Sequence, residues 1–483
     1  MDDTETPVDA KQPPPTKTNA TPLLGQIDDD VPDFLMLEQI PVNYVQQIDT
    51  DLLEPVVFNQ GSATTDGFVR FTLQNKGFLH SHSKLFVTLK ATTNESNFPM
   101  PHVGIGQIVK KAVLKIGNKT INEIDSWRHL HSVKSAMIAN EVQLERETYM
   151  TGRYINHDFV YNDGSRFDSS GYGLSTNVEK FDAVGFEVPS WLQTDASKPE
   201  EAPSLQIDLS DLFPFLKVHQ LPLYMISEPI NIELTFFPTV GERIQIESGK
   251  TASQPCEIVR DDLKFCADYV YYGATDEMAR YKEKNKEMNF SFVDYRLVEH
   301  STTQTAIRQS VVRNLGMANR LVPRIISIAS DTSKGEASLL GDCNAVSQLY
   351  DAAGQPSTTA PLRYNVKYND RFEYTTAVDS MSRLFSQFTH AEGVPFLTRQ
   401  EFSGESKAGG LTAEEFQGYA QSTELNAKFG YLATKLTNGR VGQRGIDLHL
   451  SADLPAGTDL MRSFCEYVRV ATLRDGMFEI YNA

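Results

Sequence analysis

The chain has 483 residues, of which 40% are hydrophobic, 10% aromatic and 22% charged. This is the composition of a globular protein and excludes a disordered polymer. Because hydrophobic cores stop growing near about 250–300 residues, the length predicts two domains. The 45 Lys and Arg residues against 63 Asp and Glu residues give a net charge of -18, which opposes binding to nucleic-acid phosphates. We therefore expect no sequence-specific nucleic-acid binding.

The N-terminal segment, residues 1–54, is the most acidic part of the chain. It contains twelve acidic residues and two lysines, a net charge of -10. Residues 1–30 lack an apolar period and cannot recover their ordering entropy by burial, so we predict an extended arm. Apolar residues return from Phe34 to Leu53, too irregularly spaced for one helix, and this stretch is expected to lie extended along another surface.

Targeting signals are not visible in the sequence. The first residues are acidic, and no apolar run approaches the roughly 20 residues that span a bilayer. We expect the chain to fold in the cytosol.

Alternation of apolar and polar residues is the dominant pattern after the arm. It predicts half-buried strands at Val69–Leu73, Leu85–Leu89 and Ile230–Phe236. The later part of the chain repeats the pattern in a second set of segments: Phe265–Tyr272, Phe290–Val298, Arg324–Ala329, Tyr364–Tyr368, Ile446–Leu450 and Val468–Leu473. Residues 238–255 between the two sets have the composition of a linker.

Predicted helices are short and lie between strands. One begins near Trp127, and the others cover residues 212–216, 277–284 and 411–420. The last of them has a capping box at Thr412 and Glu415. Two sets of strands with helices only in loops indicate an all-β protein of two tandem sandwiches.

A serine acyl-enzyme motif is present only by coincidence. Ser81–Lys84 matches S-x-x-K and Lys250–Ala252 weakly matches K-T-G. That serine should open a helix, whereas Lys84 begins a predicted strand, and Leu212 stands after Ser210 and Asp211 where the S-D-N motif needs Asn. The sequence therefore gives no case for an enzyme, and we predict no catalytic residue.

Sites for metals or nucleotides are equally unsupported. The two histidine pairs, His80 with His82 and His129 with His131, lack a further ligand at suitable spacing, so we interpret them as surface histidines. The segment Gly104–Val109 lacks the third glycine of a dinucleotide-binding loop. Asp28–Asp30 is more typical of a solvated run than of a cation site. We predict no metal and no cofactor.

The cysteines and sequons add little. We interpret the four cysteines as buried thiols, because their number and spacing fit neither a disulfide framework nor zinc: Cys256, Cys266, Cys343 and Cys465. The four glycosylation sequons begin at Asn19, Asn94, Asn118 and Asn289, and without a signal peptide we expect them to be bare.

Two segments carry a resemblance to a known family. Leu221-Pro222-Leu223 leads into the strand Ile230–Phe236, and the aromatic strand Ala267–Tyr272 leads into Asp276–Tyr281. This order resembles double jelly-roll major capsid proteins of double-stranded DNA viruses: virophages, Polinton-like viruses and nucleocytoplasmic large DNA viruses, with a hexon-like architecture. The segment Ser227–Pro229 departs from the family's pattern.

Other segments fit the same family over residues 60–483. Ile116–Ile121 resembles its first hairpin, Tyr364–Arg371 and Met381–His390 resemble its second hairpin and following helix, and Tyr467–Phe478 resembles its closing strands.

The resemblance implies a complete set of expectations. The fold would be all-β, with two tandem eight-stranded jelly rolls, short loop helices and an extended arm. The domains would be the arm at 1–54, the first jelly roll at 55–240, a linker at 241–258 and the second jelly roll at 259–483. Loop-rich insertions at 150–205 and 391–440 would form interaction surfaces.

The implied function is that of a major capsid protein. Homotrimers would form pseudo-hexagonal capsomers that tile an icosahedral shell around a double-stranded DNA genome. Expected partners are neighbouring capsomers, penton proteins and minor capsid proteins, and the arm is expected to contact an inner membrane or minor proteins. The protein would be made and assembled inside the host cell and reside in the virion. The alternative is a tandem β-sandwich binding module, such as a lectin or adhesin.

Overall fold

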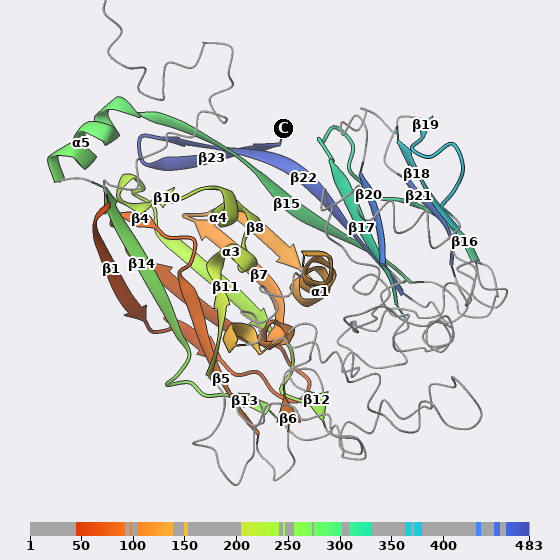
Figure 1. Cartoon of the computed structure of the whole chain (residues 1–483), viewed down its shortest axis with the longest axis horizontal. Helices are drawn as coiled ribbons and strands as arrows, with labels where there is room; N and C mark the ends of the chain where they lie inside the picture. Colours follow the sequence, from red (N-terminus) through yellow and green to blue (C-terminus); the bar gives the residue numbers. More distant parts are fainter. Residues whose placement is uncertain are drawn as a thin grey trace, which may run out of the picture.

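The computed structural model describes a set of ordered segments of the chain: residues 45–91, 97–98, 104–138, 149–152, 204–240, 245–246, 256–272, 275–301, 309–330, 363–368, 371–378, 431–435, 449–454 and 460–482. Within these residues the chain forms antiparallel sheets with a few short helices between strands (Figure 1). Most of the two loop-rich insertions and the helices predicted at 381–390 and 411–420 lie outside the described residues.

The first sandwich is built from two sheets. One sheet has the order β2-β3-β11-β7-β8, formed by β2 (Val57–Asn59), β3 (Gly67–Leu73), β11 (Ile230–Phe236), β7 (Val109–Ile116) and β8 (Lys119–Asp125). The other has the order β10-β4-β14-β5-β13, formed by β10 (Leu221–Pro222), β4 (Phe78–Leu79), β14 (Lys264–Tyr272), β5 (Lys84–Ala91) and β13 (Cys256–Ile258). In addition β1 (Val45–Leu53) pairs with β14, and β9 (Ser204–Asp208) pairs with β5. A separate short pair joins β6 (Asn97–Phe98) to β12 (Gln245–Ile246).

The alternating pattern predicts the buried face of the central strand β11 correctly. Ile232 and Leu234 are fully buried, whereas Glu233 points to the other face and forms an ion pair with Lys115 at 2.6 Å. Between the two sheets, the rings of Phe71 and Phe265 pack with centroids 5.8 Å apart. Apolar burial between the sheets is therefore what holds this sandwich together.

The domain boundary differs from the one we expected at residue 259. β13 pairs with β5, and β14 pairs with β1, β4 and β5, so both strands belong to a sheet of the first sandwich. Periodicity reveals that residues 265–272 form a strand, but it contains no information about which strand they pair with. Residues 45–53 of the expected arm are likewise a strand of this sheet, extended along a neighbour as predicted.

The second sandwich also has two sheets. The longer has the order β15-β22-β17-β20, with β23 also paired to β22, and is formed by β15 (Glu287–Ser301), β22 (Leu460–Arg474), β17 (Arg324–Ser330), β20 (Tyr431–Lys435) and β23 (Met477–Asn482). The other has the order β16-β21-β18-β19, formed by β16 (Gln309–Asn314), β21 (His449–Leu454), β18 (Arg363–Tyr368) and β19 (Arg371–Phe372). β15 and β22 pair along their full lengths, from Glu287 opposite Arg474 to Ser301 opposite Leu460.

The helices connect strands rather than forming a layer. Among the described residues they include η2 (Ile105–Ile108), α1 (Trp127–Ile138), α3 (Leu209–Leu212), α4 (Pro214–Val218), η6 (Leu223–Met225) and α5 (Thr275–Lys284). α1, α4 and α5 confirm the helices predicted near Trp127, at 212–216 and at 277–284. Among the described residues no helix is long and apolar enough to cross a membrane.

Candidate functional site

The seam between the two sandwiches is the candidate functional site, because it determines whether they act as one rigid unit. β8 and α4 of the first sandwich lie against β15 of the second. Phe215 on α4 meets Phe292 edge-on, with centroids 5.0 Å apart and planes at 89°. Phe290 then stacks on Phe478 of β23 at 5.9 Å. These buried rings supply apolar contact in geometries that aromatic pairs favour.

A polar node, the Asp294 node, lies within this apolar seam. Nδ2 of Asn122 on β8 donates to the Val293 carbonyl at 3.1 Å and to Oδ1 of Asp294 at 3.2 Å. Oδ1 of Asn122 accepts from the Phe215 amide at 3.1 Å, and the Glu123 amide donates to Oδ1 of Asp294 at 3.3 Å. Asn122 and Asp294 are both buried, so these bonds join the two sandwiches where water does not compete for them.

Arg469 completes the Asp294 node. Its guanidinium donates to Oδ2 of Asp294 at 2.8 Å and to the Ile121 carbonyl of the first sandwich at 2.8 Å. The Tyr467 hydroxyl donates to the same Oδ2 at 3.1 Å. Burial raises the pKa of Asp294 although Arg469 and Asn122 oppose the shift, and burial together with Asp294 raises the pKa of Tyr467 to about 12.

A second polar node, the Glu466 node, lies nearby in the second sandwich. Oε2 of Glu466 on β22 accepts from the Tyr295 hydroxyl at 2.6 Å and from Nε of Arg324 at 3.0 Å. Lys134 of α1 contacts the Tyr295 hydroxyl, and its Nζ lies 4.4 Å from the ring centroid. Burial opposes ionisation of Glu466, but Arg324, Lys134 and Tyr295 together lower its pKa.

The closing hairpin of the chain docks onto the first sandwich. The Gly476 carbonyl, in the turn between β22 and β23, accepts from the Ser227 amide and from the Ser227 hydroxyl, both at 2.9 Å. Gly476 has φ +82°, and a Cβ there would lie 2.8 Å from the Ser227 hydroxyl oxygen. Oε2 of Glu228 accepts from the Phe478 amide at 3.2 Å. The segment Ser227–Pro229 that departs from the family pattern therefore includes contacts across the seam.

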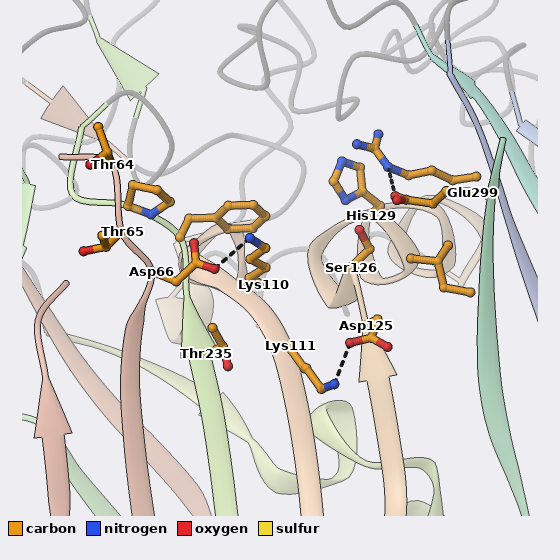
Figure 2. Close-up of a pocket in the computed structure, with 14 residues that line it drawn as sticks. Thr64, Thr65, Asp66, Lys110, Lys111, Asp125, Ser126, His129, Thr235 and Glu299 are labelled. Atoms are coloured by element: carbon orange, nitrogen blue, oxygen red, sulfur yellow. Dashed lines mark hydrogen bonds and ion pairs between the residues drawn. The ribbon is translucent and has the colours of Figure 1, made fainter. Parts of the chain in front are cut away.

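An open pocket of about 980 Å³ lies at one end of the seam (Figure 2). Residues of both sandwiches line it: Thr64, Thr65, Asp66, Lys110, Lys111, Asp125, Ser126, His129, Thr235, Phe237, Pro238, Leu297, Glu299 and Arg462. Its lysines and its arginine pair with carboxylates: Lys110 with Asp66 at 2.7 Å, Lys111 with Asp125 at 2.9 Å and Arg462 with Glu299 at 3.1 Å.

The charged groups that line this pocket are paired with opposite charges. Burial, with Arg462 and Arg128 nearby, lowers the pKa of His129 well below its usual value. Carboxylates neutralise the lysines and the arginine of the pocket. Among the described residues no group of three or more His, Cys, Asp or Glu side chains is placed to hold a metal ion.

The serine motif is part of a turn. Lys84 begins β5 rather than a helix, and Ser83 is buried. The Ser83 hydroxyl donates to the His80 carbonyl at 2.8 Å and accepts from the Asp268 amide at 3.1 Å. The rings of His80 and His82 lie 5.2 Å apart. These bonds connect the turn before β5 to β14 and so stabilise the sheet.

The prediction that all these histidines lie on the surface is wrong for His129. It is buried because it lies on the inner side of α1, whereas His131 stacks on Trp127 with centroids 4.3 Å apart. Gly106 in η2 packs under the same indole, where a Cβ would lie 2.8 Å from a ring carbon. The Gly104–Val109 segment therefore packs against α1, and close packing explains its second glycine.

The other sequence candidates divide into two groups. Cys256 and Cys465 are buried as predicted, but Cys266 is only half-buried because its strand, β14, turns that side chain away from the core. Asn289 accepts from the Thr472 hydroxyl at 2.7 Å, and Asn118 lies in the β7–β8 turn. The remaining candidates lie outside the described residues: Asn19, Asp28–Asp30, Asn94 and Cys343.

The seam residues themselves were not recognised from the sequence. The signal was nevertheless present, because Phe290, Phe292 and Asp294 share one parity in a predicted strand. That parity places a carboxylate on the buried face of β15, and a buried carboxylate requires partners. The sequence does not show that these partners come from a strand about 170 residues away.

Comparisons with known proteins bear on the fold. No protein-family model matches the chain, and no curated protein matches its sequence. PBCV-1 VP54, in a crystal structure fitted into a cryo-EM reconstruction of the virophage Sputnik, is 12% identical with a TM-score of 0.51, covering 91% of this chain and 98% of that chain. The quasi-atomic model of the PBCV-1 virus capsid gives 11% identity, a TM-score of 0.51 and coverage of 91% and 98%. The cryo-EM structure of the Sputnik virophage gives 9% identity, a TM-score of 0.54 and coverage of 92% and 89%.

These structural neighbours are double jelly-roll capsid proteins of viruses and virophages. The match extends over both sandwiches rather than one of them. This confirms the all-β double jelly-roll fold expected from the sequence.

Proposed function

We propose that this chain is the major capsid protein of a double-stranded DNA virus and that it acts as a structural protein rather than an enzyme. Three copies would form a pseudo-hexagonal capsomer, because each copy contributes two sandwiches and three-fold closure then gives six similar corners. Capsomers would tile an icosahedral shell around the genome.

The seam is the observation that carries this proposal. A capsomer with a fixed outline needs two sandwiches that keep one relative orientation. The Asp294 node, the Phe215 and Phe292 contact and the docked Gly476 turn all join the two sandwiches in this chain. A binding module of two independent sandwiches, such as a lectin, has no need for buried polar bonds between them.

The proposal extends to partners and location. Neighbouring capsomers, penton proteins and minor capsid proteins are the proposed partners, with the virion as the final location and the host cell as the place of assembly. Residues 1–44 would take part in assembly, by contacts with an inner membrane or minor proteins, and not in genome binding.

Light scattering on the purified full-length chain tests the proposal. We expect a particle of three times the 54.1 kDa chain mass at micromolar concentration in physiological salt, and larger shells as concentration rises. A stable monomer that binds immobilised glycans would contradict it and favour the lectin or adhesin.

A further inference from the structure

Helix α5 has as many acidic as basic residues, but its cations gather toward its C-terminal end. It joins β14 of the first sandwich to β15 of the second and projects from one end of the molecule (Figure 1). Four cations in and just after its second half are exposed: Arg280, Lys282, Lys284 and Lys286. Within the described part of the chain none of them forms an ion pair.

Few acids lie among these cations. Glu283 is the one acidic residue between positions 280 and 286, and Glu287 is paired with Arg474 at 2.8 Å. Cations in a last helical turn also interact favourably with the helix dipole, but this leaves their solvent-facing side open. These four residues, which we call the α5 basic face, lie at the C-terminal end of a helix whose first turn holds the acids Asp276 and Glu277.

The acidic N-terminal segment leaves the fold next to this face. Val45, the first residue of β1, is the register partner of Tyr272, three residues before α5 begins at Thr275. Residues 1–44 contain nine acidic residues and two lysines. Asp28–Asp33, with four carboxylates, ends twelve residues before Val45, and an extended chain of that length spans about 40 Å at most. The helix itself is only about 15 Å long, so the acidic run can reach all of it.

We propose that the α5 basic face binds the acidic run Asp28–Asp33 of the same chain. Opposite charge favours an acidic segment as the occupant. The segment of the same chain is favoured because the short linker to β1 gives it an effective concentration in the millimolar range at this face. A free phosphate polymer would have to displace this tethered segment. The contact would hold the start of the chain at one end of the subunit, whether or not the subunit builds a capsid.

Carbodiimide coupling of the full-length chain tests the contact, because this reagent joins a carboxylate directly to a lysine amine. We expect linkages from residues 28–33 to Lys282, Lys284 or Lys286, in product that migrates as a single chain on a denaturing gel. In about 0.5 M salt the yield should fall about fivefold, because the Debye length is then only a few Å.

Arginine variants change the charge of the α5 basic face without removing a reactive amine, because the carbodiimide does not couple carboxylates to arginine. Arg280→Gln should lower the yield about twofold by removing one of four cations, while Arg260→Gln, an exposed arginine of the first sandwich, should leave it unchanged. Equal coupling of residues 28–33 to lysines elsewhere on the surface would overturn the proposal.

Two further outcomes would also overturn it. Linkage of residues 28–33 to α5 only in the two-chain band would assign the occupant to a second copy. Loss of the linkage on adding an equimolar 20-base-pair DNA duplex, or vesicles of phosphatidylserine, would show that the face prefers phosphate.

Discussion

The two buried carboxylates of the seam region differ in electrostatic surroundings although both are shielded from water. Asp294 has one cationic partner, Arg469, and several neutral donors, and burial raises its pKa. Glu466 has Arg324 with Lys134 nearby, and its pKa is lowered. The Glu466 node lies mainly within one sandwich, whereas the Asp294 node joins two.

This difference shows how the fold offsets the desolvation of each buried carboxylate. A second cation offsets the burial of Glu466, while Asp294 depends on hydrogen bonds from both sandwiches. The domain-bridging node is therefore the more sensitive of the two to the relative position of the sandwiches, because its donors are correctly placed only when the seam is closed.

Asp294→Ala should have the largest effect. It leaves Arg469 and Asn122 facing a buried cavity without their acceptor, which typically costs about 3–5 kcal/mol. Urea unfolding followed by fluorescence measures the loss. Asp66→Ala, which removes one partner of a half-exposed ion pair with Lys110 at the rim of the pocket, is the control and should lower the free energy of unfolding by under about 1 kcal/mol. Equal losses for the two variants would show that Asp294 is not a seam residue.

Glu466→Gln should lower the free energy of unfolding by less, about 1–3 kcal/mol. The neutral amide still accepts one hydrogen bond but no longer neutralises the charge of Arg324. The same unfolding experiment measures it. A loss larger than that of Asp294→Ala would show that the node within one sandwich contributes more to stability than the node between the two.

Gly476→Ala tests the edge of the seam. It should lower the free energy of unfolding by about 1–2 kcal/mol, because φ is positive there and the new Cβ would contact the Ser227 hydroxyl. Hydrogen exchange should rise at residues 225–229 and 475–478 while β11 stays protected. Gly316→Ala, also at positive φ but with its nearest neighbours at 3.4 Å or more, is the matched control for strain without a clash. Exchange that rises equally over β11 would contradict this local assignment.

The smallest expected effect is on the pH dependence of stability, which should differ between the Glu466 node and the Asp294 node. The pKa of Glu466 lies below its ordinary 4.5, so its stabilisation is present above that pH and lost as pH falls through the folded-state value. The pKa of Asp294 lies above its ordinary 3.8, so its stabilisation is present below that pH and lost as pH rises through the folded-state value.

Urea midpoints across the acid range measure this contrast. Glu466→Gln should flatten the fall of stability on acidification, and Asp294→Asn should steepen it. The same change in slope for both variants would contradict the opposite pKa directions.

The sequence predicts strands better than it predicts their partners. Alternation located β11 and its buried residues Ile232 and Leu234 because burial on one face is a local consequence of a period of two. It could not assign β14 to the first sandwich, since pairing with β1 depends on residues more than 200 positions away.

The candidate site shows the same division. The parity of β15 puts Asp294 on the same face as Phe290 and Phe292, although Asp294 was not recognised as a site residue from the sequence. The partners Asn122 and Arg469 come from separate strands, and no local pattern in the sequence connects them. Helix α1 was predicted from its apolar spacing, but that spacing does not show that Arg462 of the second sandwich lies near His129 and helps to lower its pKa.

Cryo-EM of the assembled full-length chain tests the central claim most directly. We expect three-fold particles with six jelly rolls around the axis, two from each chain, held in one fixed relative orientation across the Asp294 node. Particles of a single chain in which the two sandwiches take variable orientations would contradict it.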